Sequence, residues 1–127
     1  MGKPTRSKTG QTGPRLRVVI EPDVAIGPGK ADLLEAIRDT GSISAAGRKL
    51  GMSYRRAWLL VDELNQHLGA PVVAAVTGGA KGGGAALTRT GEEVLTRYRA
   101  MEAACRTAIA ADVQALRNLI KRNQRQK

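Results

Sequence analysis

Two arginines, Arg55 and Arg56, are the residues of this sequence whose type and position point most directly to chemistry. They follow Ser53, whose hydroxyl is suited to cap a helix, so they fall in the first turn of that helix. A guanidinium group can donate two hydrogen bonds to the edge of a guanine, and a helix N-terminus fits the major groove of DNA. These residues therefore predict contact with duplex DNA. The plainer alternative is that both arginines lie on a solvated helix face.

The elements that must position these arginines are two helices joined by a tight turn. Small or apolar residues recur with helical spacing in the first helix, at Ile43, Ala46, Gly47 and Leu50. Gly51 then ends that helix, and the second is expected over 53–68. Its apolar stripe is formed by Ala57, Trp58, Val61, Leu64 and Leu68. Because Gly47 has no side chain, the two helices are expected to cross closely, with Trp58 anchoring the second one in the core.

Six neighbouring residues join the arginines in the predicted contact set, the first of them being Ser53, the cap of the second helix. Ser42 and Ser44 begin the first helix, where a hydroxyl caps the backbone and a phosphate contact is possible in addition. Arg48 and Lys49 are expected to face solvent or backbone phosphate rather than bases. Tyr54 has two readings, since its hydroxyl can contact a phosphate or its ring can pack behind the helix.

Residues 77–85, TGGAKGGGA, form a glycine-rich segment between two predicted strands, at 72–76 and 86–88. A strand, a glycine loop and a second strand indicate a β-hairpin. A P-loop would need Ser or Thr after its lysine, and Gly82 follows Lys81 instead. We expect the hairpin to be a wing that lies on the phosphate backbone, the alternative being a flexible tip without function. The predicted contacts at its tip are Lys81, Gly82 and Gly83.

Upstream, the sequence predicts a strand at 16–20, a linker rich in Pro and Gly at 23–29, and a helix at 30–39. That helix is expected to bury its apolar side chains Leu33, Leu34 and Ile37. Together with the two helices and the hairpin, these segments give the element order of a winged helix-turn-helix.

Thr90 and Glu93 have the spacing of a capping box, so a last helix is expected to begin there. Its apolar residues recur every three or four positions, at Tyr98, Met101, Cys105, Ile109, Val113, Leu116 and Ile120. A helix of more than about 25 residues with this stripe carries more apolar surface than such a small domain covers. We expect a second copy of the chain to cover it, which makes the protein a homodimer.

The formal net charge of +10 comes from the two ends of the chain. Residues 1–17 and 117–127 each carry five basic residues and no acidic one, whereas the middle holds 11 of each sign. Charged ends of this kind attract any polyanion without selecting a sequence. Four basic residues of the middle gather without an acidic neighbour, at Arg48, Lys49, Arg55 and Arg56. This local segregation is the stronger evidence for a DNA-binding face.

Catalytic and metal-binding chemistry find little support. Cys105 is the single cysteine, which excludes an intrachain disulfide, fits a reducing cytoplasm and favours a small core side chain. His67 is the single histidine, too few ligands for zinc, and the carboxylate pairs at 62–63 and 92–93 diverge on their helices. No stretch has the pattern of a signal peptide or a membrane span. We expect a cytoplasmic, nucleoid-associated protein that is not an enzyme and needs no metal or cofactor.

The fragments SIS, GMSYRRAW, ELNQ and VTGGAKGGGAALTRTGEEVL resemble the N-terminal domain of the ModE family of molybdate-responsive bacterial transcription regulators, over residues 30–100. The similarity to the DNA-binding domain of LysR-type regulators is more distant. The resemblance implies a winged helix-turn-helix that dimerises through its flanking helices and binds operator DNA. It implies that Ser53, Tyr54 and Arg55 start the recognition helix and that Trp58 lies in the core. The implied wing tip consists of Gly78, Gly79, Lys81, Gly82, Gly83 and Gly84.

Two features depart from that family's pattern. Arg56 stands where the family has a small polar residue, which implies a different operator preference. The family's molybdate-binding module follows its DNA-binding domain, and we expect none within these 127 residues. The resemblance therefore implies binding of double-stranded DNA and leaves molybdate sensing without a site.

We predict a mainly α fold with a small β-hairpin, namely a winged helix-turn-helix with a long C-terminal dimerisation helix. The expected division is a disordered basic tail at 1–14, a DNA-binding domain at 15–90, a dimerisation helix at 91–120 and a basic tail at 121–127. The expected function is sequence-specific transcriptional regulation of the ModE type, with the recognition helix in the major groove and the wing on phosphate. Two alternatives stay open: a non-specific nucleoid-type protein driven by its tails, and an adaptor that pairs with a separate sensor subunit.

Overall fold

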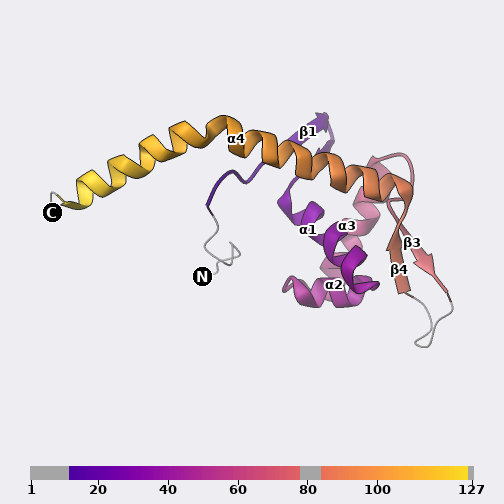
Figure 1. Ribbon diagram of the computed structural model, residues 1–127. Helices are drawn as coiled ribbons and strands as arrows, with labels where there is room; N and C mark the ends of the chain where they lie inside the picture. Colours follow the sequence, from indigo (N-terminus) through magenta and orange to yellow (C-terminus); the bar gives the residue numbers. More distant parts are fainter. Residues whose placement is uncertain (1–11, 78–83, 126–127) are drawn as a thin grey trace.

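The computed structural model describes residues 12–77 and 84–125, and these form four helices and two short antiparallel hairpins (Figure 1). The elements in chain order are β1 (Val18–Glu21), β2 (Val24–Ile26), α1 (Pro28–Thr40), α2 (Ile43–Lys49), α3 (Tyr54–His67), β3 (Val73–Val76), β4 (Gly84–Leu87) and α4 (Arg89–Arg125). Helices α1, α2 and α3 pack together, the β3–β4 hairpin lies beside them, and α4 crosses the domain and extends well beyond it. The predicted winged helix-turn-helix with a long last helix is confirmed.

The core lies where α1 meets α2, α3, the β3–β4 hairpin and α4. The apolar side chains predicted to be buried in α1, Leu33, Leu34 and Ile37, are fully enclosed. Leu64 of α3 and Tyr98 of α4 close the same cluster. Helix α1 begins at Pro28 rather than at residue 30, because a proline without an N–H group is well placed in the first turn.

The helix-turn-helix is formed by local features that can be recognised in the sequence, namely two serine caps and a glycine at the helix crossing. The hydroxyl of Ser42 accepts the N–H of Ala45 at 3.0 Å, and the hydroxyl of Ser53 accepts the N–H of Arg56 at 3.0 Å, so both helices are capped as predicted. The close crossing is confirmed as well. A Cβ at Gly47 would lie 3.2 Å from the Cβ of Ala57, tighter than normal packing allows.

The prediction that Trp58 lies in the core is wrong. Its side chain is 41% exposed, and Leu60, which the predicted stripe omitted, is buried instead. Each residue turns an α-helix by about 100°. Trp58 follows the buried Ala57 directly and is therefore rotated onto the flank of α3, whereas Leu60, Val61 and Leu64 return to the buried side.

The N-terminal segment contains a hairpin that the sequence analysis missed. The predicted linker at 23–29 holds strand β2, which pairs antiparallel with β1 and matches Val18 with Ile26. Pro22 and Asp23 form the turn between the strands, a role that both residue types favour, rather than the start of a linker. The predicted strand at 16–20 is found two residues later, and Ile26 joins the core.

The β3–β4 hairpin is the predicted wing, with Val73 opposite Leu87 and Val76 opposite Gly84. Strand β4 begins two residues earlier than expected. The reason is a backbone tie, because the N–H of Ala85 donates to the carbonyl of Gly41 at 2.9 Å and holds the strand against the end of α1. Residues 78–83, which include the predicted tip contacts Lys81, Gly82 and Gly83, lie outside the described residues, as do residues 1–11 of the predicted tail at 1–14.

Helix α4 runs for 37 residues and takes in residues 121–125, which had been expected to form a tail. The predicted capping box is wrong. Thr88, not Thr90, caps the helix, since its hydroxyl accepts the N–H of Gly91 at 3.0 Å, while Glu93 pairs with Arg97. No helix within the described ranges is long and apolar enough to span a membrane.

Tyr98 belongs to the core and not to the exposed stripe of α4. It is fully buried, and its hydroxyl donates to the carbonyl of Leu16, so α4 is tied to the start of the first hairpin. Burial, together with the nearby charge of Glu102, raises the pKa of Tyr98 to about 12.

The next residue, Arg99, fastens α4 to α1. Its Nη2 lies 2.9 Å from Asp32 and 2.7 Å from Glu35, its Nη1 lies 2.9 Å from Glu102, and its Nε also donates to Glu35 at 3.1 Å. Burial alone lowers the pKa of Arg99, but the hydrogen bonds to its three carboxylate partners outweigh that and raise the pKa above its ordinary value. Beyond this clamp, α4 leaves the domain.

Candidate nucleic-acid interface

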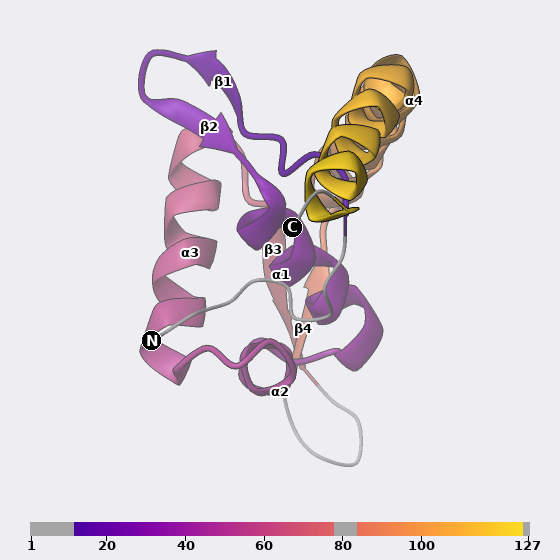
Figure 2. The ribbon, with the colours of Figure 1, turned by 90° about the vertical axis from the view of Figure 1, so that its left-hand side faces the viewer.

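The predicted contact residues gather at one end of the domain, away from α4. Figure 2 shows α2 at the bottom of the domain, the first turn of α3 beside it, and α4 at the upper right. The β3–β4 hairpin runs down toward the same lower end. The fold therefore brings the start of α2, the leading turn of α3 and the wing together on a surface that α4 leaves uncovered.

Arg55 and Arg56 are both exposed, and they point in different directions. Ala57, the next residue, faces the core. With about 100° per residue, Arg55 lies nearly opposite the buried face, and Arg56 lies on one flank of α3. Trp58 lies on the other flank, so the two arginines do not present a common surface. The sequence analysis considered Arg55 and Arg56 together, but in the helix they point to different sides and can have different contacts.

The positive charge of this end is not compensated by the protein itself. Arg48, Lys49, Arg55 and Arg56 are exposed, and none of them belongs to an ion pair within residues 12–77 and 84–125. Other basic residues of the domain are paired, as Arg99 is with its three carboxylates. A cluster of unpaired cations on one face attracts a polyanion.

The serines have a structural role that leaves part of their hydrogen-bonding capacity open. The hydroxyl oxygen of Ser42 accepts the N–H of Ala45, and that of Ser53 accepts the N–H of Arg56, so each hydroxyl proton is still available for donation. Ser53 is exposed, whereas Ser42 and Ser44 are half-buried at the edge of a groove.

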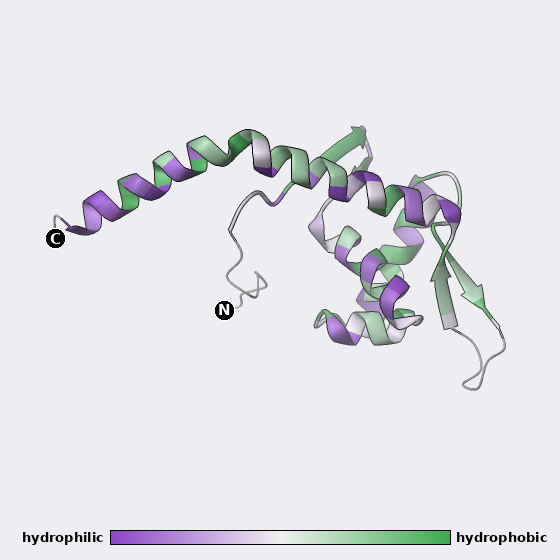
Figure 3. Cartoon of the chain, in the orientation of Figure 1, coloured by the Kyte–Doolittle hydropathy of each residue, from purple (hydrophilic) through white to green (hydrophobic). Residues whose placement is uncertain are grey.

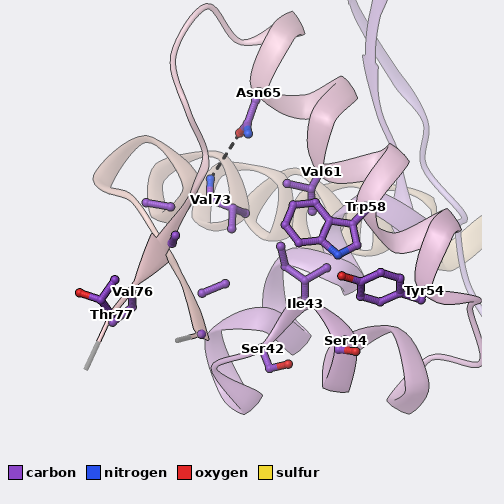
Figure 4. Close-up of a pocket in the computed structure, with 14 residues that line it drawn as sticks. Ser42, Ile43, Ser44, Tyr54, Trp58, Val61, Asn65, Val73, Val76 and Thr77 are labelled. Atoms are coloured by element: carbon purple, nitrogen blue, oxygen red, sulfur yellow. Dashed lines mark hydrogen bonds between the residues drawn. The ribbon is translucent and has the colours of Figure 1, made fainter. Parts of the chain in front are cut away.

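This groove lies between α2, the Trp58 flank of α3 and the wing, and has a volume of about 410 Å³ (Figure 4). Tyr54 and Trp58 stand on one side of it, with Ile43 below them and Val73 and Val76 of the wing across from them. The tyrosine and tryptophan rings contact each other edge to face, with centroids 6.1 Å apart. Of the two positions expected for Tyr54, the structure shows the exposed one, because the side chain does not pack behind the helix.

Asn65 holds the two sides of the groove together, and the sequence analysis missed it. Its side-chain oxygen accepts the N–H of Val72 at 2.7 Å and approaches the N–H of Val73 at 3.4 Å, which fixes the start of β3 against α3 (Figure 4). Both donors come from the segment that leads into the wing. The only signal in the sequence was a polar residue on the same flank of α3 as Trp58, seven residues or about two turns further along the helix.

Metal binding finds no geometric basis in the described residues. Residues 12–77 and 84–125 contain no group of three or more His, Cys, Asp or Glu side chains arranged to hold a metal ion. Cys105 lies half-buried on α4, far along the chain from the groove.

The element order, the close α2–α3 crossing and the β3–β4 hairpin define a winged helix-turn-helix domain. Residues 30–92 match the family of bacterial regulatory helix-turn-helix proteins of the lysR family. The chain thus contains a helix-turn-helix domain of the lysR family.

Curated relatives match this chain over part of their own length. The chain is 51% identical over 78 residues to the molybdenum-pterin-binding protein MopB of Rhodobacter capsulatus, covering 61% of this chain and 29% of MopB. It is 33% identical over 117 residues to the molybdenum transport protein ModE of Azotobacter vinelandii, covering 82% of this chain and 43% of that protein. With the DNA-binding transcriptional dual regulator ModE of Escherichia coli K12 it shares 41% identity over 71 residues, 56% of this chain and 27% of the relative. The chain spans less than half the length of these relatives.

Solved structures agree on the fold. The CbnR DBD–DNA complex superposes with a TM-score of 0.53 at 22% identity, over 68% of this chain and 95% of that one. The full-length LysR-type regulator LysG of Corynebacterium glutamicum with bound effector Arg gives a TM-score of 0.50 at 25% identity, over 73% of this chain and 28% of LysG.

Proposed function

We propose that this chain binds double-stranded DNA in a sequence-specific way and regulates transcription. In this proposal α3 enters the major groove, and the wing lies along the phosphate backbone. Support comes from the lysR-family domain and from the regulator relatives, one of which is described as a DNA-binding transcriptional regulator. A molybdenum compound has no part in the proposal, because the relatives with molybdenum-related names share less than half of their length with this chain.

The observation that carries the proposal is the uncompensated arginine at the outermost point of α3. Arg55 is exposed, lies in the first turn of a capped helix, and faces directly away from the core. A helix whose N-terminal turn enters the major groove places such a side chain against base edges. We assign Arg55 to a base, because a bidentate contact with guanine is the contact its fork-shaped donor group suits best.

The other basic residues are assigned to the backbone. Arg56 on its separate flank, together with Arg48 and Lys49 at the end of α2, would meet phosphates on either side of the groove. Ser42, Ser44 and the hydroxyl of Tyr54 would donate to the same backbone. Lys81 with Gly82 and Gly83 would add a phosphate contact from the wing.

We further propose that the protein acts as a homodimer joined through α4. Beyond Tyr98, α4 exposes Met101, Leu116, Leu119 and Ile120, aliphatic side chains that leave much of their surface in water. A second copy of the same helix would cover them. Two copies would then present two α3 helices to half-sites about 34 Å apart or a multiple of that distance.

Selection of bound sequences from a random DNA library, followed by two single substitutions, tests the proposal. A palindromic consensus is expected. Arg55→Ala should lower affinity for the consensus about 5- to 150-fold and relax the preference at one base pair, the cost of one bidentate contact. Arg56→Ala should weaken consensus and scrambled DNA alike and reduce the slope of log affinity against log salt by about one contact.

Arg97→Ala is the matched control, because Arg97 is an exposed arginine of α4, the helix that lies away from α2 in Figure 2. It should leave both affinity and preference unchanged. If no consensus emerges, and Arg55→Ala has no larger effect than Lys121→Ala, the protein is a non-specific binder driven by its charged ends and the proposal is wrong.

A further inference from the structure

Helix α3 exposes three large apolar side chains at the surface assigned to DNA. Tyr54 is 61% exposed, Trp58 41% and Leu59 50%. A single exposed apolar residue is ordinary on a protein surface, but a contiguous group of them marks an interaction site. These three lie within two turns of the helix, around Arg55, so the candidate base-reading surface is apolar as well as cationic.

The fold holds the two aromatic rings in place. Tyr54 and Trp58 are one turn apart and contact each other edge to face. Trp58 borders the groove beside Ile43 and Val61, and the wing faces it from the other side (Figure 4). Asn65 ties the segment that leads into the wing to α3, so the two walls of the groove beside the indole are held together. The apolar surface is therefore preorganised for contact.

The major groove offers one apolar group to such a surface. Thymine carries a C5-methyl group there, whereas the other major-groove edges present hydrogen-bond donors and acceptors. Trp58 and Leu59 follow Arg55 by three and four residues, one turn further along the same helix. A base pair contacted by Arg55 would thus be followed, within a step or two, by base pairs that these side chains reach.

We propose that Trp58, with Tyr54 beside it and Leu59 on the other side of Arg55, reads thymine methyl groups next to the base pair read by Arg55. This inference rests on the proposed function, because it needs α3 in the major groove. It assigns specificity to apolar contact in addition to the arginine hydrogen bonds, and it predicts thymine at one or two defined positions of each half-site.

Replacement of thymine by deoxyuridine tests this directly, because it removes the methyl group and leaves base pairing unchanged. The full chain should bind the selected consensus about fourfold more weakly for each contacted thymine that is replaced, the size expected for one buried methyl group. Replacement at the remaining thymines should have no effect.

Combining the variant Trp58→Ala with the deoxyuridine replacement shows whether Trp58 makes the methyl contact. In this variant the deoxyuridine effect should disappear at the positions that Trp58 reads, provided that circular dichroism shows an unchanged fold. Val19→Ala, at an exposed apolar residue of β1 outside both proposed interfaces, is the matched control and should keep the full effect. If Trp58→Ala instead weakens binding equally to both DNAs, the contact is not with methyl groups and the inference fails.

Tryptophan fluorescence monitors this contact specifically, because Trp58 is the single tryptophan in the chain. Its fluorescence emission should change on binding of consensus DNA by the unmodified protein. Unchanged emission, or a consensus whose thymines all tolerate replacement, would overturn the methyl-reading role while sequence-specific binding through Arg55 stood. Absence of any consensus would instead overturn the proposed function itself.

Discussion

Helices α3 and α4 both expose large apolar side chains, and the contrast between them is instructive. On α3 these side chains are two aromatic rings and a leucine on the surface of the folded domain, around Arg55, which has no ion-pair partner among the described residues. On α4 they are aliphatic and recur along the half that projects from the domain, where Figure 3 shows hydrophobic and hydrophilic segments alternating toward the C-terminus. The apolar side chains of the two helices are similarly exposed, but the charged residues beside them differ.

Those surroundings indicate different partners. Around α3, the four unpaired basic residues would make association with another copy of the same surface unfavourable, and they favour a polyanion. Along α4, residues 101–116 carry both acidic and basic side chains, so these parts of two helices do not repel each other, whereas residues 117–127 are basic without an acidic residue. An apolar surface is thus assigned to DNA or to a second protein chain by the charges beside it.

The largest expected effect comes from placing charge on the α4 stripe. Leu116→Glu with Ile120→Glu should convert the proposed dimer to a monomer, because two buried carboxylates per chain would oppose the helix pairing. Light scattering should show half the mass, and affinity for the palindromic consensus should fall by about 100-fold or more as binding by two linked modules is lost. Thr107→Glu with Asn118→Glu, on the opposite face of α4, should leave the mass unchanged. A monomeric wild type would contradict the dimer directly.

Arg99→Ala should weaken the attachment of α4 to α1. It removes one guanidinium from three carboxylates, which leaves their negative charges close together, and is expected to lower the free energy of unfolding by about 1.5–3 kcal/mol. Urea denaturation measures this loss. Arg99→Lys, which keeps the charge but not the forked geometry, should recover part of it. Equal stability of Arg99→Ala and wild type would show that the clamp is not needed for docking of α4.

Tyr98 makes the stability of the α4 attachment depend on alkaline pH. Its pKa is raised from 10.0 to about 12, so the folded state holds the proton more tightly than the unfolded chain. The resulting stability is fully present below pH 10 and is lost as the pH rises toward 12, in total about 2–3 kcal/mol. Tyr98→Phe should remove this alkaline loss in urea denaturation from pH 9 to 12, at a cost near neutral pH of about 1 kcal/mol for the missing hydrogen bond to Leu16. A parallel alkaline decline in the variant would assign it to other groups.

The smallest effect is expected at the crossing of α2 and α3. Gly47→Ala places a methyl group 3.2 Å from the Cβ of Ala57 and should cost about 1 kcal/mol, because crowding outweighs the gain in helix propensity. Gly29→Ala in α1 is the matched control, since a Cβ there meets nothing within 4 Å, and it should be neutral or slightly stabilising. A stabilised Gly47→Ala would mean that the crossing tolerates a wider spacing.

Prediction from sequence succeeded for most features set by neighbouring residues and failed for contacts between distant ones, although the turn at Pro22 and Asp23 and the Thr88 cap of α4 are local features that it missed. The serine caps, the wing strands and the buried face of α1 depend on neighbours in the chain, and all were found. Trp58 was misplaced because a helical stripe read from sequence tolerates an error of one residue at its edge, and one residue is about 100°. The hydrogen bond from Tyr98 to Leu16 and the pairing of Arg99 with Asp32 join residues 82 and 67 positions apart, and no spacing rule reports such contacts.

Helix α4 is attached to the domain at Tyr98 and Arg99, so a small tilt there produces a larger displacement at the far end of the helix. From residue 99 to 125 it extends about 40 Å at 1.5 Å per residue. A tilt of about 5° at the attachment moves the far end by about 3.5 Å, close to the rise of one base pair. In the proposed dimer on DNA, the stiffness of the contacts made by Tyr98 and Arg99 would therefore set how much the spacing of the operator half-sites can vary.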